Sequence, residues 1–504
     1  MNSIAVKRGP GGAATGGGRI ASTACLLLAG VVLSGCILGT ERPDPALDIP
    51  DRYREAARNQ GPPRPPSEAW WRGFRSAELT RLMELAPSGN FDIAVAVAQI
   101  AQADAQAGIS RAPLFPSLTG TGSAERARSP ATANAGPQTF SQFNLGLTAS
   151  YMVDFWGKNR AAFYAAEENA IVSRYNRDVV TLSAISTVAN TYFQILAAQD
   201  QLRVARNNVA AAERILNLIK LQFAGGTASQ LDVSQQAALV GIQRATIPPL
   251  VVTERQNMAA LAVLVGRAPE RLQVRGGSMA QIAIPRVTPG LPSQLLYHRP
   301  DVRQAEEQLA ASNFSVEVAR ASFFPQIQLT GQTGFQSGAL SSLFAPGAWY
   351  YSMIAGLTQP IFDGYLLKSQ LEQAKGVQLQ NLQLYRKAVI SAFADVDKAL
   401  IALQQTTLQE RLQADVVANS RRAFQVAETQ LRAGTVNLIT VLQTQQTLFT
   451  AETALAQVRL AKLLAAVSLF QALGGGWTID DTTARRIAIN AGHAPTAPPP
   501  PVTR

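Results

Sequence analysis

The chain is poor in cysteine and histidine, two residue types on which much protein chemistry depends. Its 504 residues include only Cys25, Cys36, His298 and His493 of these types. A Ser/His/Asp set, a Cys/His zinc cluster and a glycine-rich phosphate loop are all missing from the sequence. We therefore expect no catalytic residue, no metal site and no bound cofactor.

Long apolar runs and strong one-sided charge are also missing. No run of 18 consecutive apolar residues follows Cys36, so we expect no membrane-spanning helix. A membrane crossing would then need a closed β-barrel, because lipid offers the backbone no hydrogen-bond partners. The net charge is +11, of which the first 35 residues carry three basic side chains and no acidic ones. The remaining bases alternate with acids along helical segments, so we interpret them as a solvated face and expect no nucleic-acid partner.

The first 36 residues have the pattern of an exported lipoprotein. Basic residues precede an apolar stretch from Ile20 to Leu33, which is too short to span a bilayer comfortably and resembles a secretory signal peptide. Ser34-Gly35-Cys36 then completes a bacterial lipobox, in which the cysteine thiol receives a diacylglyceryl group. We predict a signal peptide at 1–35 and lipidation of Cys36 with diacylglycerol and a fatty acyl chain, which leaves no cysteine for a disulfide.

Two further segments have the composition of extended or disordered chain. Residues 36–66 end in Gly61-Pro62-Pro63-Arg64-Pro65-Pro66, which indicates an extended linker behind the anchor. Residues 478–504 carry a proline run near their end, and we expect this tail to be partly disordered.

The sequence between the linker and the tail repeats itself. Arg111-Ala-Pro-Leu-Phe-Pro returns as Arg320-Ala-Ser-Phe-Phe-Pro, and Asp154-Phe-Trp-Gly157 returns as Ile361-Phe-Asp-Gly364, at offsets of 209 and 207 residues. A repeat this long indicates a duplicated half and not a solenoid. We expect halves at 67–273 and 299–477, joined by a connector at 274–298. Each half would contain a helix, a hairpin, a long helix, a turn and a return helix.

The two predicted hairpins lie at about 114–155 and 324–362. In the first, apolar side chains at odd positions from Phe143 to Val153 alternate with polar ones, as in a strand with one apolar face. The second return strand, about Trp349 to Phe362, alternates less clearly. Such strands suit a lipid-facing barrel with a wet lumen, although a soluble sandwich is the alternative. Four strands cannot enclose a lumen, so we expect three chains to share a twelve-stranded barrel.

Long helices follow each hairpin. Residues 157–223 contain no proline, and apolar residues recur at steps of three and four there and in 382–403. This spacing predicts coiled-coil seams. A helix of some 65 residues is about 100 Å long, so the predicted fold is mainly α with a transmembrane β-barrel. A solid helical bundle is the alternative to a tunnel with an aqueous bore.

Each long helix meets its return helix at a glycine-containing turn. Glycine adopts the left-handed conformation that ends a helix tightly. We expect these tips to lie farthest from the strands and to dock another protein. The residues concerned are Gly225, Gly226 and Thr227 in the first half, and Ala433, Gly434 and Thr435 in the second.

With these features together, the chain resembles the TolC-like outer-membrane factors, in their lipoprotein branch, from Cys36 to about Trp477. The most specific segments are 291–309, Leu264-Val-Gly-Arg-Ala-Pro269 and Ala472-Leu-Gly-Gly-Gly-Trp477. The resemblance implies a homotrimeric exit duct for small molecules in the bacterial outer membrane, extending into the periplasm. It also implies a periplasmic adaptor and an inner-membrane pump as partners, and outer-membrane lipid around the barrel. Ile37, in place of the aspartate that retains lipoproteins at the inner membrane, agrees with this location.

The family often carries an aspartate in the final return helix, and this chain does not. Gln443 stands in its place, with Thr440 one turn earlier, and the first-half equivalent of Thr440 is Asp232. A carboxylate ring at a constriction would have to come from Asp232, although compensation of the helix dipole is an equal alternative for this residue. The remaining constriction candidates are apolar: Leu231, Leu438, Ile439 and Leu442.

Other functions remain to be weighed against this resemblance. A related duct could serve protein secretion or metal export, but the six methionines do not cluster as metal export might require. A structural coiled-coil lipoprotein would lack the alternating strands, and an enzyme would need a convergent acidic or histidine-bearing pocket.

Overall fold

The computed structural model describes residues 43–47, 49–54, 66–130, 136–287 and 289–478. Cys36, the predicted signal peptide, much of the linker and almost all of the predicted tail lie outside the described residues. Lipidation of Cys36 therefore stays a prediction.

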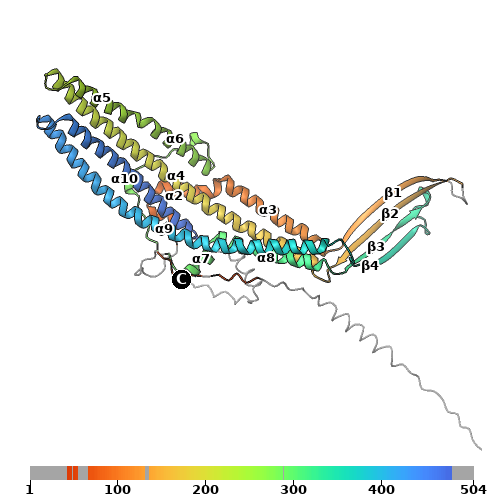
Figure 1. Cartoon of the computed structure of the whole chain (residues 1–504). Coiled ribbons are helices and arrows are strands. Elements are labelled where there is room, and N and C mark those ends of the chain that lie inside the picture. Colours follow the sequence, from red (N-terminus) through yellow and green to blue (C-terminus); the bar gives the residue numbers. More distant parts are fainter. Residues whose placement is uncertain (1–42, 48, 55–65, 131–135, 288, 479–504) are drawn as a thin grey trace, which may run out of the picture. The chain divides into compact units, whose positions relative to one another are not determined.

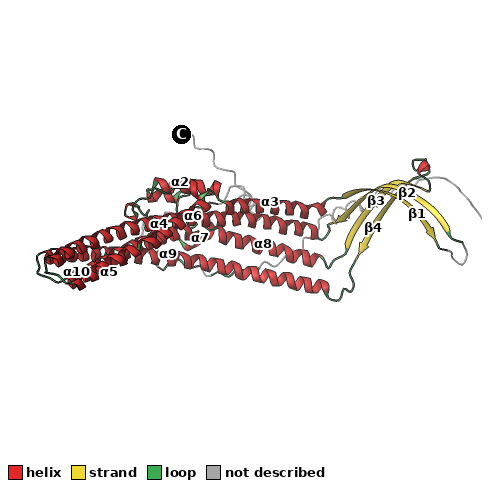
Figure 2. Ribbon diagram, turned by 90° about the horizontal axis from the view of Figure 1, so that it is seen from above, coloured by secondary structure: helices red, strands yellow, loops and turns green. Residues whose placement is uncertain are grey.

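The elements follow the predicted order within each half (Figures 1 and 2). The first half contains η1 (Trp70–Phe74), α2 (Ala77–Gly89), α3 (Phe91–Arg111), β1 (Ser117–Ser129), β2 (Gln138–Val153), α4 (Lys158–Ala224), α5 (Gln230–Ala245) and α6 (Ile247–Leu264). The connector contains α7 (Pro292–His298), and the second half contains α8 (Pro300–Ala321), β3 (Gln326–Ser337), β4 (Trp349–Thr358), α9 (Leu366–Arg432) and α10 (Leu438–Ala472).

The chain divides into two compact units, which do not coincide with the two repeat halves. Among described residues, one unit contains 104–168 and 310–380, and the other contains 44–103, 169–309 and 381–478. Each unit therefore combines segments of both halves, because equivalent elements of the two halves pack together.

The first unit holds a single antiparallel sheet in the order β1-β2-β3-β4. The hairpins pair internally, and β2 joins β3 through a ladder that runs from Phe143 opposite Ser337 to Val153 opposite Ile327. Among the described residues, β1 and β4 each have one neighbouring strand and leave one edge unpaired. Strand β4 ends at Thr358, earlier than predicted, and Ile361 and Phe362 follow it with exposed side chains.

An aspartate caps the long helix at each strand-to-helix corner. The carboxylate of Asp154 accepts the backbone N–H groups of Asn159 and Arg160, both at 2.9 Å. The carboxylate of Asp363 accepts the N–H of Leu367 at 3.0 Å. These contacts satisfy donors that the first turn of a helix leaves without partners. The two halves therefore use the same kind of cap, although the two aspartates stand at different positions of the repeated motif.

A second repeated motif closes the first corner. The indole of Trp156 donates its N–H to the carbonyl oxygen of Pro325 at 2.9 Å. Its ring stacks on Phe324, with the ring centroids 4.6 Å apart. The Arg320–Pro325 motif thus packs against the corner of the other half.

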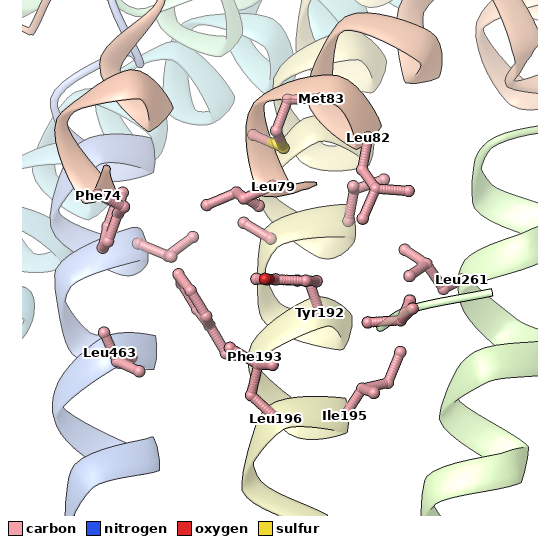
Figure 3. Packing of buried hydrophobic residues seen from close by; sticks show 14 of the residues in the cluster. Phe74, Leu79, Leu82, Met83, Tyr192, Phe193, Ile195, Leu196, Leu261 and Leu463 are labelled. Atoms are coloured by element: carbon pink, nitrogen blue, oxygen red, sulfur yellow. The ribbon is translucent and has the colours of Figure 1, made fainter. Parts of the chain in front are cut away.

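The main hydrophobic core lies in the second unit, where η1 and α2 cover α4 and α10 (Figure 3). Phe74, Leu79 and Leu82 are fully buried and face Phe193 of α4 and its neighbours. Trp70 stacks on Phe470 of α10 at 4.7 Å between ring centroids. Burial of several large apolar side chains, each worth about 2 kcal/mol, fixes the middle of the long helices.

The first return helix differs from the sequence-based prediction. The sequence predicts one return helix, whereas the structure has two helices, α5 and α6, with a break at Thr246. Pro248 and Pro249 follow the break directly and lack the N–H groups that would continue the ladder of α5. Their ring geometry suits the first turn of a new helix, which α6 begins at Ile247.

Two described helices, Lys158–Ala224 and Leu438–Ala472, are long and apolar enough to cross a membrane by composition alone. Half of the apolar window of each is buried inside the structure. Core helices of soluble proteins pass the same test, and both helices contribute to the cores described here.

Candidate functional site

The four-stranded sheet has one apolar and one polar face. Directly paired residues point to the same side, so the ladders define each face from strand to strand. One row across the apolar face, for example, is Gly122, Leu145, Phe335 and Trp349. Neighbouring rows place Leu147, Tyr151, Leu329, Met353 and Leu357 on the same face.

The opposite face is polar and almost free of charge. Its rows contain side chains such as Thr119, Thr148, Gln328, Gln332 and Ser352. Many apolar side chains on the other face are exposed, including Met353 at 88% and Leu357 at 69%. A sheet with an uncovered apolar face and a neutral polar face suits lipid on one side and water on the other.

The predicted helix tips both form the Schellman motif. Gly226 has φ of +75° and Gly434 has φ of +71°. In the first tip, the N–H of Gly226 bonds to the Phe223 carbonyl at 3.0 Å, and that of Thr227 bonds to the Gln222 carbonyl at 2.9 Å. The second tip repeats both bonds at equivalent positions. These pairs of bonds are those of the Schellman helix ending.

The two tips lie close together in the second unit. The side chain of Gln222 donates to the Leu431 carbonyl at 3.4 Å. Behind the tips is a shared apolar cluster from α4, α9 and α10, against which Val233 of α5 packs. Its buried members are Ala211, Ile215, Ile219, Phe424, Ala427, Leu431, Leu438, Val441, Leu448 and Phe449.

Asp232 belongs to a capping box at the start of α5. Its carboxylate accepts the backbone N–H of Ser229 at 2.8 Å and the Ser229 hydroxyl at 2.7 Å. The Ser229 hydroxyl in turn accepts the N–H of Asp232 at 3.2 Å. The backbone hydrogen bond from Ser229 is the main cause that lowers the pKa of Asp232. Asp232 therefore caps the start of α5, and its carboxylate is negative at neutral pH.

The second half builds the same cap from different residues. Asn437 is the N-cap of α10, and its side chain accepts the N–H of Thr440 at 3.0 Å. Thr440 therefore occupies the position equivalent to Asp232, without a charge. Gln443 is exposed one turn further along.

The apolar constriction candidates divide into two groups. Leu438 is 5% exposed and packs inside the tip cluster. Leu231 and Ile439 are 64% and 53% exposed, and Leu442 is partly buried against the same cluster. Leu438 therefore stabilises the tip of its own chain. Leu231 and Ile439 are exposed and could contact a neighbouring chain.

An ion pair between the helices α9 and α10 was not foreseen from the sequence. The Glu410 carboxylate accepts Lys462 Nζ at 2.9 Å and Arg459 Nε at 3.1 Å. Burial opposes the charge of Glu410, but the hydrogen bonds and charges of Lys462 and Arg459 prevail and lower its pKa. Glu410 is about fifty residues from Arg459 and Lys462 in the sequence. The ion pair can therefore be recognised only when the register between the antiparallel helices is known.

The segment 291–309 forms a second polar cluster in the same unit. Arg299 has a largely buried side chain that bonds to Asp301 at 2.6 Å, and to Asp395 of α9 and the carbonyl of Ala472 at 3.4 Å. A Cβ at Gly474 would lie 1.9 Å from the carbonyl oxygen of His298. The two most distinctive landmarks of the sequence, around Arg299 and Gly474, therefore pack against each other. Within the described ranges, no group of three His, Cys, Asp or Glu residues is placed to hold a metal ion.

An antiparallel sheet with an exposed apolar face and a polar face, together with long antiparallel helices whose tips are paired, defines a channel protein of the bacterial outer membrane. The model of the outer membrane efflux protein family matches residues 82–267 and 291–475. The chain belongs to this family. The predicted family, mainly helical fold, outer-membrane location and efflux role are thereby confirmed.

The relatives cover nearly the whole chain. The pyoverdine export outer membrane protein OpmQ of Pseudomonas aeruginosa is 37% identical over 466 residues, which cover 91% of this chain and 96% of OpmQ. The toluene efflux pump outer membrane protein TtgI of Pseudomonas putida is 30% identical over 458 residues, which cover 89% and 97%. The solved outer-membrane channel OprN has a TM-score of 0.82 and 26% identity, with coverage of 88% and 100%.

Proposed function

We propose that three copies of this chain form one passive exit duct, through which a periplasmic adaptor and an inner-membrane pump expel small molecules. The sheet carries this proposal, because its polar face is almost free of charge and its two outer strands each leave an edge unpaired among the described residues. Open strand edges are not tolerated in lipid. A closed ring of three sheets removes every edge and encloses a wet lumen.

The class of cargo follows from the neutral polar lining. A wide lumen of amide and hydroxyl side chains offers weak contacts to many solutes, so selectivity resides in the pump. The names of OpmQ and TtgI refer to pyoverdine and toluene, two small molecules of very different polarity. We propose small organic molecules as the cargo of this chain too.

Partner docking is assigned to the paired tips. Gly225, Gly226, Thr227 and Ala433, Gly434, Thr435 are all exposed. The Schellman geometry holds each tip in one conformation, which favours binding without a large ordering cost. The lipid anchor at Cys36 would keep the duct at the membrane, since two or more acyl chains hold a protein far better than one.

Reconstitution tests the duct itself. Purified full-length protein in planar bilayers should give a large conductance in discrete steps, each step corresponding to one trimer. A cell that lacks its own exit duct should regain drug resistance only when this chain is expressed with its cognate adaptor and pump. Absence of conductance from correctly assembled protein would contradict the proposal.

The anchor is tested separately by mass spectrometry of the mature N-terminus. We expect diacylglycerol and acyl groups on Cys36, and loss of both in Cys36→Ser. An unmodified Cys36, or cleavage at another site, would show that the lipobox is not used.

A further inference from the structure

The charged residues of the sheet lie in one short segment. In the two hairpins, 117–153 and 326–358, the only charged side chains are Glu125, Arg126 and Arg128. All three are near the end of β1 that leads into the hairpin loop. The two hairpins contain no other charged side chain with which these three residues could pair. Their clustering at one strand end therefore calls for a functional explanation.

The ladder places the two arginines on the apolar face. Arg126 is opposite Ser141, and Arg128 is opposite Thr139. The preceding rows of the same face contain Ala124 opposite Phe143, and Gly122 opposite Leu145. Glu125 directly precedes Arg126 in the strand, and therefore points to the polar face. The apolar band of the sheet thus ends in two positive charges, which the neighbouring glutamate does not face.

Aromatic residues mark the border of that band. Phe143, Phe335 and Trp349 occupy the last apolar rows before the loops. Aromatic girdles in membrane barrels lie where hydrocarbon gives way to headgroups. Arg126 and Arg128 are one and two rows of this face beyond Phe143, at the depth of headgroups, and both are exposed.

The two arginines lack an acidic partner in the part of the chain that the structure describes. No ion pair of either residue occurs among the described residues. A neighbouring copy that paired its β4 with this β1 edge would bring no acid either, because residues 326–362 contain no charged side chain. Two guanidinium groups on a lipid-facing surface fit phosphate, which arginine binds through two parallel hydrogen bonds.

We propose that Arg126 and Arg128 bind the phosphate groups of the phosphorylated glycolipid in the outer leaflet of the outer membrane. The strand end concerned leads away from α3 and α4, so it faces the cell exterior when the helices lie in the periplasm. In that respect the inference rests on the proposed function. The site would fix the depth and rotation of the barrel in the outer leaflet.

The test measures lipid binding to delipidated, detergent-extracted full-length protein by native mass spectrometry. Wild-type protein should bind bis-phosphorylated lipid A roughly tenfold more tightly than dephosphorylated lipid A at low salt, since each basic residue near an anionic surface contributes measurably. Arg126→Gln/Arg128→Gln should lose this preference, whereas Arg126→Lys/Arg128→Lys should keep most of it. The matched control is Glu125→Gln, on the same strand but the opposite face, which should bind like the wild type.

Each outcome decides the proposal. A phosphate preference that survives in the double glutamine variant, or is absent from the wild type, would overturn it. Full competition by millimolar inorganic phosphate would show a site for soluble anions and not for lipid. If the double variant does not assemble, the wild-type comparison of the two lipids still decides. Conductance of the same samples separates the two ideas: normal conductance without lipid preference refutes the lipid site alone, and lost conductance refutes the duct.

Discussion

At the scale of single residues, the duplicated halves keep a backbone geometry and vary the side chains that stabilise it. Both tips end in a glycine with positive φ, and both use a threonine whose hydroxyl bonds to a carbonyl of the last turn at 3.1 Å. The caps beyond them differ, because Ser229 and Asp232 in one half correspond to Asn437 and Thr440 in the other. The first turn of each helix needs an acceptor for its free backbone N–H groups, and several polar side chains can supply one.

The tip glycines provide the first prediction. A Cβ at Gly226 or Gly434 would meet no other atom within 4 Å, so an alanine there is strained only by its left-handed backbone, at about 1–2 kcal/mol. Gly434→Ala should therefore lower the thermal unfolding temperature. Gly225→Ala is the control, since its φ is not positive and its added carbon makes ordinary contacts of 3.6 Å. Equal effects of both substitutions would contradict this account.

Asp232 provides the second prediction. Its carboxylate is partly exposed, ionised and near the tips, so three copies around a narrow opening would attract cations. Asp232→Asn should weaken cation selectivity and block by divalent ions in single-channel recordings. Without an acid at Thr440 or Gln443, the effect should be modest. If selectivity and block are those of the wild type, Asp232 acts only in its capping box, and closure depends on Leu231 and Ile439.

The stability that Asp232 contributes depends on pH with a defined sign. Because folding lowers the pKa of this group below its ordinary value of 3.8, the contribution is present above that pH. It is lost as the pH falls through the lower pKa of the folded state. Acid should therefore loosen the start of α5 without affecting α10, whose cap at Asn437 does not titrate.

At the scale of helices and strands, periodicity predicted most of the elements. The alternation from Phe143 to Val153 predicted the first hairpin, and the steps of three and four within 157–223 predicted the long helix. The break at Thr246 was missed although Pro248 and Pro249 are visible in the sequence, because the apolar pattern continues across them. The partners of Asp154 and Glu410 could not be predicted, since they depend on register between elements.

The Glu410 cluster provides the third prediction. Glu410→Gln should lower the free energy of unfolding by about 1 kcal/mol, because Lys462 and Arg459 lose a half-buried partner. The loss should appear above pH 4.5, the ordinary pKa of this group, and vanish as the pH falls through its lowered value. Glu213→Gln is the control, because its pair with Arg244 joins α4 and α5 but is more exposed and should contribute little. Chemical denaturation at pH 7 and below pH 4 checks both variants.

At the scale of the whole molecule, assembly follows from the count of strands. The four described strands leave two edges unpaired and cannot form a closed barrel, which is why we propose that three chains assemble. The family and fold could be recognised from the sequence through motifs such as Arg299-Pro-Asp and Gly474-Gly-Gly-Trp477, and the structure shows that both are packing sites. The site at the arginine pair of β1 could not be predicted from the sequence, because only the strand pairing shows that both arginines lie on the apolar face.

The fourth prediction concerns that assembly. Native mass spectrometry of detergent-extracted protein should show a trimer. A charge on the apolar face of β1, such as Gly122→Asp, should prevent membrane insertion. Thr121→Asp, on the polar face of the same strand, should be tolerated. A stable monomer that conducts ions, or equal effects of the two substitutions, would contradict the shared barrel.

The unpaired edges of β1 and β4 also have a consequence for biogenesis. The unpaired N–H and C=O groups of an edge strand can pair with any other strand. A newly exported chain would therefore expose two such edges until it meets other copies of itself. In the proposed ring of three chains, closure needs two successive encounters between chains, so its yield would depend steeply on how many chains arrive together. Slow delivery would leave subunits waiting for partners, and excess delivery would favour open-ended strand addition over closed rings. For the proposed ring, the rate of export, and not only the stability of the finished protein, would set how many functional ducts a cell obtains.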